Sequence, residues 1–488
     1  SEFEAAKPPR GRKRRFVKRW TRRSFTLVVA VVATVLTLFF TVDLGRFPLL
    51  KQRAESEASK YLRRPMHIGR IGATIAPGVF TFDDVVIDGK HPGDRPFLKA
   101  GRIYVYIPWW TLLHKELIVE IGLTDWQMLV EMFPDGSSQP RLAPERSANP
   151  TKRPFTITAR SIYARNGTFI YEDHMTPWGV VAPNLNFALV RAENLKQYVG
   201  RAEFSRGTVQ IQSYKPMATD MSARFVVDGP LVSLHHIDLT TDGSKSHVNG
   251  SVDFAHWPEQ TYNVNSTVDF PRMKDIFFSN ESWRLRGTSR FTGVFHLFPG
   301  GRNLAGDFTS DDAGVNDLDF RQLHGSLEWT PQHFVVSHAD AALLGGATRF
   351  DYSLAPLGTK LPATATFNAD YVNIDLTQLN RLMNLRSLEL TGGARGDLSM
   401  TWPNGHFGTG RTGHGRTLIS PSTTREMASV SLPPTPRPTE PEPQPFRSVR
   451  PLEALALAGD VEYRLDPDGW TFENSWAATP FKFIRFKG

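Results

Sequence analysis

RPFLKAGRIYVYIPWWTLLHKELIVEIGLTDWQMLV, residues 95–130, is the stretch that decides the fold class. Within it and just beyond it, apolar side chains recur at every second position and alternate with polar side chains or tyrosines. This alternation is typical of strands that bury one face and leave the other in water. The stretch therefore predicts successive half-buried β-strands. Their apolar sides are expected to be Ile103, Val105 and Ile107, then Leu117, Val119, Ile121 and Leu123, then Trp126, Met128, Val130 and Met132.

Alternation and turn signals continue through the rest of the chain. Segments 185–189, 232–234 and 366–368 alternate in the same way. Eight Asp-Gly or Asn-Gly pairs follow residue 43, and such pairs suit the positive φ angles of tight hairpin turns. Strand, turn and strand in succession predict a mostly β fold built as a long antiparallel meander. The eight pairs begin at Asp88, Asp135, Asn166, Asp228, Asp242, Asn249, Asn404 and Asp468.

An apolar run near the N-terminus precedes these strands. Phe25 to Val42 contains 18 residues without a charge, and it would span roughly 27 Å as a helix, close to the thickness of a hydrocarbon core. A cleaved signal peptide is the alternative, but no small-x-small cleavage site follows the run. We therefore expect an uncleaved transmembrane helix over residues 24–43. A short helix over 49–62 should follow and should end before Pro65.

The charge of the chain is concentrated in its first residues. The chain carries 57 Lys and Arg against 49 Asp and Glu, a net charge of +8. Residues 1–23 contain ten basic and two acidic side chains, so this segment alone supplies the +8. The positive-inside rule then places the tail, 1–23, in the cytoplasm and the bulk of the chain outside it. A nucleic-acid partner is not expected, because no folded segment carries a basic excess.

Composition divides the remainder into further segments. We expect a helix and β segment over 44–140, a polar boundary loop over 141–153, and β repeats over 154–403. Residues 404–451 are rich in Gly, Pro, Ser and Thr, so this insert is expected to lack regular structure. Its proline-rich portion is a candidate partner-binding segment. A further β repeat is expected over 452–488, and we expect the chain to be a piece of a longer protein.

No catalytic or metal-binding motif stands out in the sequence. Walker, zincin and nucleophile-elbow signatures are missing, and no G-x-G-x-x-G sequence opens an expected helix, so an enzyme is not expected. The chain has no cysteine, which excludes disulfides and thiolate metal sites. Neighbouring side chains on a strand point to opposite faces, and on this ground a histidine metal site is not expected and no cofactor is inferred. The histidines weighed in this way are His235, His236, His247 and His256. Asp311, Asp312, Asp317 and Asp319 lack the spacing and the terminal Glu of a calcium loop, so a solvated turn is expected there, and Asp83 and Asp84 are expected at a strand edge.

A long sheet with one apolar face has to cover that face. A second sheet covers it in a sandwich, and the sheet closes on itself in a barrel. The third solution is an open gutter filled by something apolar, and lipid is the natural filler beside a membrane anchor. Trp109 and Trp110, like Trp126 and Met128, fit a ligand wall, but an ordinary core or a contact with the membrane surface is favoured. These arguments do not distinguish an open gutter from a sandwich.

A family resemblance favours the gutter. The order of a helix ending at KYLRRPMHIGRI (60–71), then FTFDDVVIDG (80–89), then the stretch at 95–130 resembles the opening of AsmA-like proteins. These are relatives of TamB and of the chorein-type bridge-like lipid transfer proteins. HGSLEWTPQHFVVSHADAALLGGATRFDYSL (324–354) and LTGGARGDLSMTWPNG (390–405) resemble the repeated unit of this family. The resemblance covers 49–135 and, more loosely, 155–400. The insert at 404–451 departs from the family pattern.

The resemblance implies a bacterial inner-membrane protein with one spanning helix and its bulk in the periplasm. Its open hydrophobic groove would carry phospholipids passively toward the outer membrane, with envelope proteins as candidate partners at the far end. A scaffold for outer-membrane protein assembly is the alternative, and an anchored hydrolase is a third reading. We expect the groove entrance to be lined by Val119, Ile121, Trp126, Met128 and Val130, because they alternate on strands that follow the anchor closely. The inward parity stays open, since a one-residue slip exchanges the faces.

Overall fold

The structure is a computed structural model that describes residues 48–488 except 63, 75–77, 90, 92, 109–115, 136–137, 140–155, 176, 194–195, 257–258, 299, 384–389, 422–454 and 480–481. The expected tail (1–23), the expected transmembrane helix (24–43), Trp109, Trp110 and the expected boundary loop (141–153) lie outside the described residues. Among the described residues, none of the helices has the length and apolar character needed to cross a bilayer.

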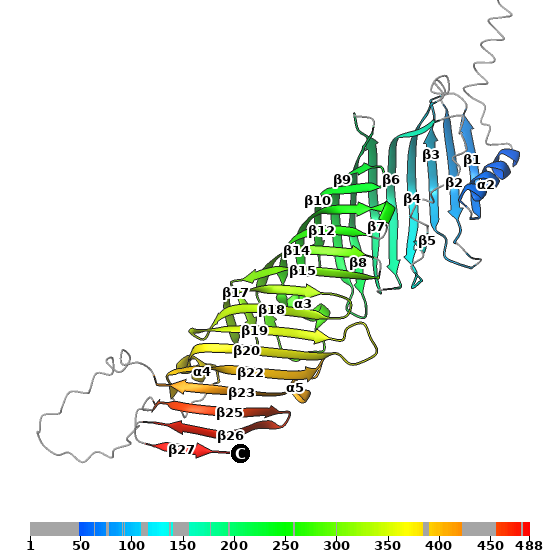
Figure 1. Cartoon of the computed structure of the whole chain (residues 1–488). Coiled ribbons are helices and arrows are strands. Elements are labelled where there is room, and N and C mark those ends of the chain that lie inside the picture. Colours follow the sequence, from blue (N-terminus) through cyan, green and yellow to red (C-terminus); the bar gives the residue numbers. More distant parts are fainter. Residues whose placement is uncertain are drawn as a thin grey trace, which may run out of the picture. The chain divides into compact units, whose positions relative to one another are not determined.

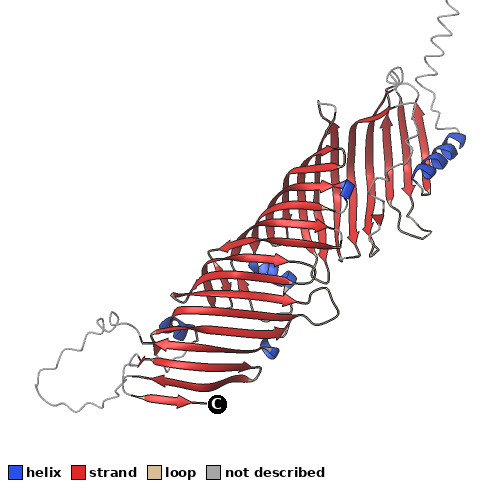
Figure 2. Cartoon of the chain, viewed as in Figure 1, coloured by secondary structure: helices blue, strands red, loops and turns tan. Residues whose placement is uncertain are grey.

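Strands make up most of the described chain, which confirms the predicted mostly β fold (Figure 2). The expected helix over 49–62 is also confirmed, as helix α2. The described helices are α2 (Pro48–Leu62), α3 (Phe270–Phe277), α4 (Leu376–Leu382), α5 (Phe407–Gly410) and the 3-10 helix η3 (Phe254–His256). The first strands are β1 (Met66–Thr74), β2 (Val79–Ile87), β3 (Leu98–Tyr106), β4 (Glu116–Met132), β5 (Ser138–Gln139), β6 (Thr156–Asp173), β7 (Trp178–Arg191) and β8 (Tyr198–Ile211).

The later strands continue along the chain in short antiparallel steps. The strands from the middle of the chain are β9 (Met217–Asp228), β10 (Leu231–Thr241), β11 (Ser244–Asp253), β12 (Gln260–Asp269), β13 (Leu285–Arg286), β14 (Thr288–Phe298), β15 (Gly301–Ser310), β16 (Ala313–Val315), β17 (Leu318–Trp329), β18 (Phe334–Leu343) and β19 (Gly346–Ala355). The last strands are β20 (Thr364–Asp375), β21 (Leu390–Thr391), β22 (Gly393–Pro403), β23 (Thr412–Ser420), β24 (Leu455–Ala456), β25 (Ala458–Asp466), β26 (Gly469–Ala478) and β27 (Phe483–Phe486).

Twenty-five of the described strands belong to one open antiparallel sheet, and only the parallel pair β21 and β24 lies apart. From β8 onward the long strands pair almost strictly in sequence order (Figure 1). The exceptions step over the short strands: β12 pairs with β14, β15 with β17, β20 with β22, and β23 with β25. The predicted long antiparallel meander is therefore confirmed.

The chain divides into two compact units. Unit 1 comprises the described parts of Ser1–Leu129, Arg146–Phe169 and Asn184–Leu195. Unit 2 comprises the described parts of Val130–Glu145, Ile170–Pro183 and Lys196–Gly488. Strands β4, β6 and β7 contribute residues to both units.

Helix α2 covers the free edge of β1 in unit 1. The backbone N–H of Ile68 donates to the Glu55 carboxylate at 2.8 Å, and that of Met66 donates to the Ser59 hydroxyl at 2.9 Å. An uncovered edge would present unpaired N–H groups to other chains. The same helix places Ala54 against the core of unit 1, so it both shields the edge and completes the core.

A row of residues with left-handed backbone conformation crosses unit 1. Asp84, Asp125, Asn166 and Asn184 lie within β2, β4, β6 and β7, and each has a φ between 51° and 54°. Asn and Asp tolerate this conformation better than most other residues. The Asn166 side chain donates to the Asp125 carboxylate, and its backbone N–H donates to the Asn186 side chain at 3.3 Å. These polar contacts therefore link the irregular positions of neighbouring strands.

Two of the predicted turns are wrong. Asn166-Gly167 lies within β6 and Asn249-Gly250 lies within β11. At both sites the glycine serves close packing. A Cβ on Gly167 would lie 2.0 Å from Cε2 of Trp126, and a Cβ on Gly250 would lie 2.1 Å from the carbonyl oxygen of Thr261. The dipeptide alone does not reveal whether its glycine bends the chain or makes room for a neighbour.

The predicted lack of structure over 404–451 is wrong for its first part. Residues 404–421 form a turn, helix α5 and strand β23, which pairs with β22 on one side and β25 on the other. Gly415 leaves space for the side chain of Tyr463 on the neighbouring strand: a Cβ on Gly415 would lie 2.6 Å from the hydroxyl of Tyr463. Residues 422–451 lie outside the described residues.

Candidate functional site

One face of the sheet in unit 2 carries no charge along its centre. Cross-strand partners can be followed from β8 to β26 on this face, which we call the apolar face. Its central row contains only apolar residues, glycine, serine and a tyrosine, and each of them is buried or half-buried. The row consists of Phe204, Met221, Leu239, Ser246, Ser266, Phe291, Phe308, Gly325, Ala339, Phe350, Ala369, Leu398, Gly415, Tyr463 and Phe472.

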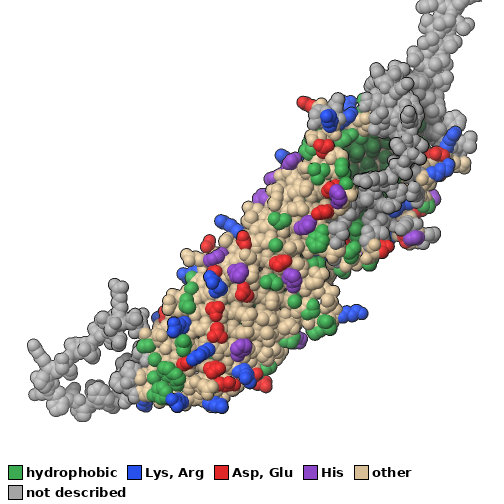
Figure 3. All heavy atoms as spheres, viewed as in Figure 1, with side chains coloured by type: hydrophobic (Ala, Val, Ile, Leu, Met, Phe, Trp, Pro, Cys, Tyr) green, Lys and Arg blue, Asp and Glu red, His purple; other side chains and the backbone are tan. Residues whose placement is uncertain are grey.

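The row next to it, on the opposite face, is mostly charged. Its members are exposed or half-buried, and eleven of the fourteen are acids, bases or histidine. Ion pairs link some neighbours, for example Arg349 Nε to Asp340 Oδ1 at 2.9 Å. Figure 3 shows such charged and histidine side chains scattered over this polar face. The row consists of Asp220, Thr240, Lys245, Thr267, Arg290, Thr309, His324, Asp340, Arg349, Asp370, Asp397, Arg416, Glu462 and Glu473.

Tyrosines on the apolar face stay neutral. Burial raises the pKa of Tyr262 to about 12. Burial likewise raises the pKa of Tyr352 and of Tyr463, with nearby acidic groups and tyrosines adding to the effect. A buried phenol resists ionisation because its anion would lose water. The face therefore remains uncharged at these positions across the physiological pH range.

Arg302 is the one charged residue among the described cross-strand partners of the apolar face from β8 to β27. It pairs with Leu297 at the end of β14 and β15, and it is 7% exposed. Burial lowers the pKa of its guanidinium, while the charge of Asp173 acts in the opposite direction. The charge lies at a strand end, outside the central row.

The segment that contains α3 covers part of the apolar face. Phe277 packs edge-on against Trp329 of β17, with ring centroids 5.2 Å apart. Phe278 packs against Phe334 of β18 at 5.9 Å and against Tyr352 of β19 at 6.5 Å. These partners lie at one end of their strands, so α3 and the residue after it bury this end of the apolar face.

Polar contacts lock the covering segment in place. The carboxylate of Glu281, 3% exposed, accepts from Trp402 Nε1 at 3.0 Å and from the Gly405 N–H at 2.9 Å. The ring of Phe407 in α5 packs edge-on against Trp402 at 5.0 Å. At the other end of these strands, Leu376 and Leu379 of α4 pack on the same face. The chain itself thus covers both ends of the face near β17–β22.

The apolar face is exposed on the last strands. Trp470 of β26 pairs with Leu465, and Ile484 of β27 pairs with Ala477, which places both on the apolar face. Trp470 is 55% exposed and Ile484 is 58% exposed. Trp470 lies near the start of β26 and Ile484 lies opposite Ala477 near its end, so the apolar face is exposed toward both ends of these strands.

The five residues predicted to line an entrance share one face of β4. The side-chain alternation of β4 changes at Asp125, which has a left-handed φ, so Ile121 and Leu123 lie on the same face as Trp126 and Met128. Strand alternation adds Val119 and Val130 to this face. Ile121 and Met128 are half-buried, whereas the other three are buried. Trp126 belongs to a core cluster with Ile68, Ile71, Val85, Ala100 and Ala164.

The carboxylates weighed in the sequence have ordinary partners. Asp83 accepts from Arg102 Nε at 2.7 Å. Asp312 accepts from the Thr288 N–H at 2.9 Å, and Asp319 accepts from Arg286 at 2.8 Å. They do not converge on one point. Two groups do converge among the described residues: His236 with Asp238 and His247, and Glu131 with Glu172 and His174. The sequence argument considered His236 and His247 without Asp238 and expected no metal site there, and it did not consider the second group. Strand pairing brings them together, and spacing in the sequence gave no signal.

Comparison with known proteins does not identify a family for this chain. No protein-family model matches the chain, and no curated protein matches its sequence.

Proposed function

We propose that the chain is a membrane-anchored lipid-binding protein whose apolar face lines an open groove for phospholipid acyl chains. The observation that carries the proposal is the uncharged row that continues from β8 to β26 beside a charged row on the opposite face. A lipid groove requires an apolar face along the whole sheet, whereas the scaffold alternative requires one only where the chain packs its own core on it. The resemblance to AsmA-like proteins supports the same function.

The physical basis is the transfer of methylenes from water to an apolar surface. Each buried methylene contributes about 0.8 kcal/mol, so a chain of about sixteen carbons gains on the order of 10 kcal/mol. The head group would remain in water at the open side of the groove. Binding of this kind removes most of the barrier to leaving a bilayer. It gives no direction, so transport along the groove is passive.

The proposal places the acyl chains against β23–β27 first. There the apolar face is exposed at Trp470 and Ile484, whereas α3, α4 and α5 cover it near β17–β22. In this proposal the chain lies in a bacterial inner membrane through the helix expected at 24–43, with its sheet in the periplasm. Phospholipid would move toward the outer membrane.

Photo-crosslinking tests the lipid-binding face. A photoreactive amino acid at Leu398 or Tyr463, on the apolar face, should capture phospholipid in living cells. The same group at Asp397 or Arg464, next in sequence but on the polar face, should capture at least tenfold less, because acyl chains have no apolar surface there. Mass spectrometry of the crosslinked product identifies the lipid. Crosslinks to protein alone at both apolar positions would refute lipid binding and support the scaffold alternative.

A reporter fusion tests the topology. Alkaline phosphatase fused after residue 140 should be active, because the ten basic residues before Phe25 hold the tail in the cytoplasm and send the following segment across. A fluorescent protein that matures only in the cytoplasm should stay dark at the same position. Cytoplasmic activity of the fusion would contradict the proposed location of the sheet.

A further inference from the structure

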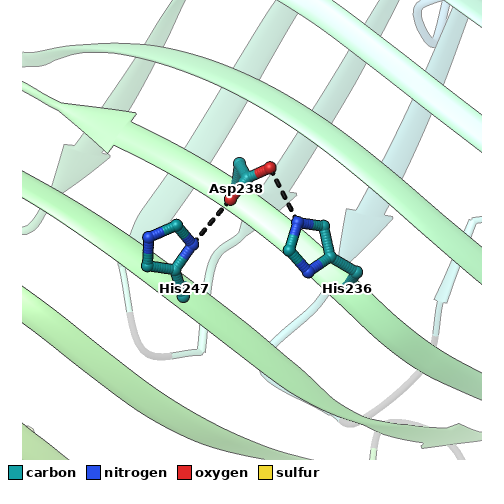
Figure 4. Close-up of side chains that lie close together, drawn as sticks. All are labelled: His236, Asp238 and His247. Carbon is teal, nitrogen blue, oxygen red and sulfur yellow. Dashed lines mark hydrogen bonds and ion pairs between the residues drawn. The ribbon is translucent and has the colours of Figure 1, made fainter.

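Two histidines and one aspartate meet on the polar face of unit 2. His236 Nε2 lies 2.9 Å from Asp238 Oδ2, and His247 Nδ1 lies 2.6 Å from Asp238 Oδ1 (Figure 4). The two imidazole rings have centroids 6.2 Å apart. One carboxylate therefore has an imidazole on each of its two oxygens, and all three side chains are exposed.

The pairing of β10 with β11 produces this arrangement. Asp238 lies directly opposite His247 across the two strands. His236 lies two residues before Asp238 on β10, so both side chains point to the same face. A register shift between Leu234 and His236 sets this parity. The three residues thus come from two strands whose geometry fixes the positions of their Cβ atoms.

We propose that His236, Asp238 and His247 form a binding site for a divalent transition-metal ion, with Zn²⁺ as the best match. Histidine nitrogen and aspartate oxygen are ordinary Zn²⁺ ligands, at about 2.0–2.2 Å from the ion. The ligand atoms all lie within 4.8 Å of one another. Bonds of this length in a tetrahedral site require ligand atoms about 3.4 Å apart. Small side-chain rotations would open space for the ion, and water would complete the coordination because the site faces solvent.

The donor types of the site suit a cation. A carboxylate is anionic near neutral pH, and a neutral imidazole offers a nitrogen lone pair. The two nitrogens that face Asp238 can then turn to the metal.

Other histidine–carboxylate contacts lack this combination. His256 Nδ1 contacts Asp253 at 2.6 Å, but this pair offers only one imidazole. His174 lies 3.5 Å from Glu131 and 3.8 Å from Glu172, again with a single imidazole, and Glu131 is 8% exposed. Zn²⁺ favours nitrogen ligands over a set dominated by carboxylates. These two groups provide controls for the proposed site.

Calorimetric titration of the purified, chelator-treated full chain with ZnCl₂ tests the site. One high-affinity equivalent should bind. His247→Ala and His236→Ala should each lower the affinity at least about tenfold, since even second-shell losses cost that much. His256→Ala and His174→Ala should leave the titration unchanged. The proposal is overturned if the wild type shows no saturable binding, or if the affinity survives both substitutions at the site. Loss of binding in His174→Ala alone would assign the ion to the other group.

Discussion

Replacing Ile484 with aspartate should reduce phospholipid capture and transfer at least tenfold. Ile484 lies on the apolar face of β27, where the proposed function places acyl chains. A carboxylate there would either face methylenes or keep water against them, and an unpaired buried charge costs several kcal/mol. Because Ile484 is already 58% exposed, the strand should still form. Transfer of fluorescent phospholipid between vesicles measures the effect.

The neighbouring residue supplies a matched control. Phe483 is 57% exposed, pairs with Ala478 and stacks on Trp476 of the polar face. Phe483→Asp therefore adds the same charge, at the same exposure and one position away, but on the opposite face. It should leave lipid transfer near that of the wild type, and both variants should resist protease equally. Equal transfer by the two variants, whether high or low, would contradict a specific role for the apolar face.

Replacing Trp126 with alanine should lower the free energy of unfolding by about 3–5 kcal/mol, as expected for loss of a buried aromatic side chain. Trp126 is 6% exposed and packs among Ile68, Ile71 and Val85. The cavity would lie at the centre of the unit 1 core. Urea unfolding followed by circular dichroism measures the change. Tyr104→Ala is the control: Tyr104 lies on β3 with 38% exposure, and its loss should cost about 1 kcal/mol or less.

A double-mutant cycle measures the energetic coupling between Gly167 and the ring of Trp126. Gly167→Ala alone should destabilise the chain, because the new methyl group would lie 2.0 Å from the Trp126 ring. In the Trp126→Ala background the same methyl group fills space, so its cost should fall or change sign. Contacting residues commonly couple by about 0.5–3 kcal/mol. Additive effects of the two substitutions would show that the ring does not rest on Gly167 in solution.

The strand pattern around residues 95–130 was sufficient to predict the fold class. A side-chain period of two is a local property, and it survives in β3 and β4 as the apolar partners Ile103 with Leu123 and Val105 with Ile121. Helix α2 was predictable for the same reason, since spacing and Pro65 mark it locally. The five candidate lining residues do share a face, although the alternation alone could not show that the two halves of β4 agree. The left-handed backbone conformation of Asp125, between the two halves, makes them agree.

The structural role of glycine was the hardest to predict from the sequence. Asn166-Gly167 and Asn249-Gly250 look like turns, and GHFGTGRTGHG looks unstructured, yet all three lie in ordered parts of the sheet. In each case a glycine accommodates a partner that is distant in sequence, such as Trp126 over Gly167 or Tyr463 over Gly415. The missing Cβ allows unusual backbone angles in a turn, and it also leaves space for a tertiary contact.

By itself, the sequence determined the β class, the alternation, the first helix and the sequence-ordered meander, because these depend on neighbours along the chain. Only the tertiary structure decided which parity forms the apolar face from β8 to β27, where α3, α4 and α5 cover it, and that His236 and His247 meet at Asp238. These features depend on register and on bulges. Register is a relation between strands, and each bulge exchanges the faces of every residue beyond it.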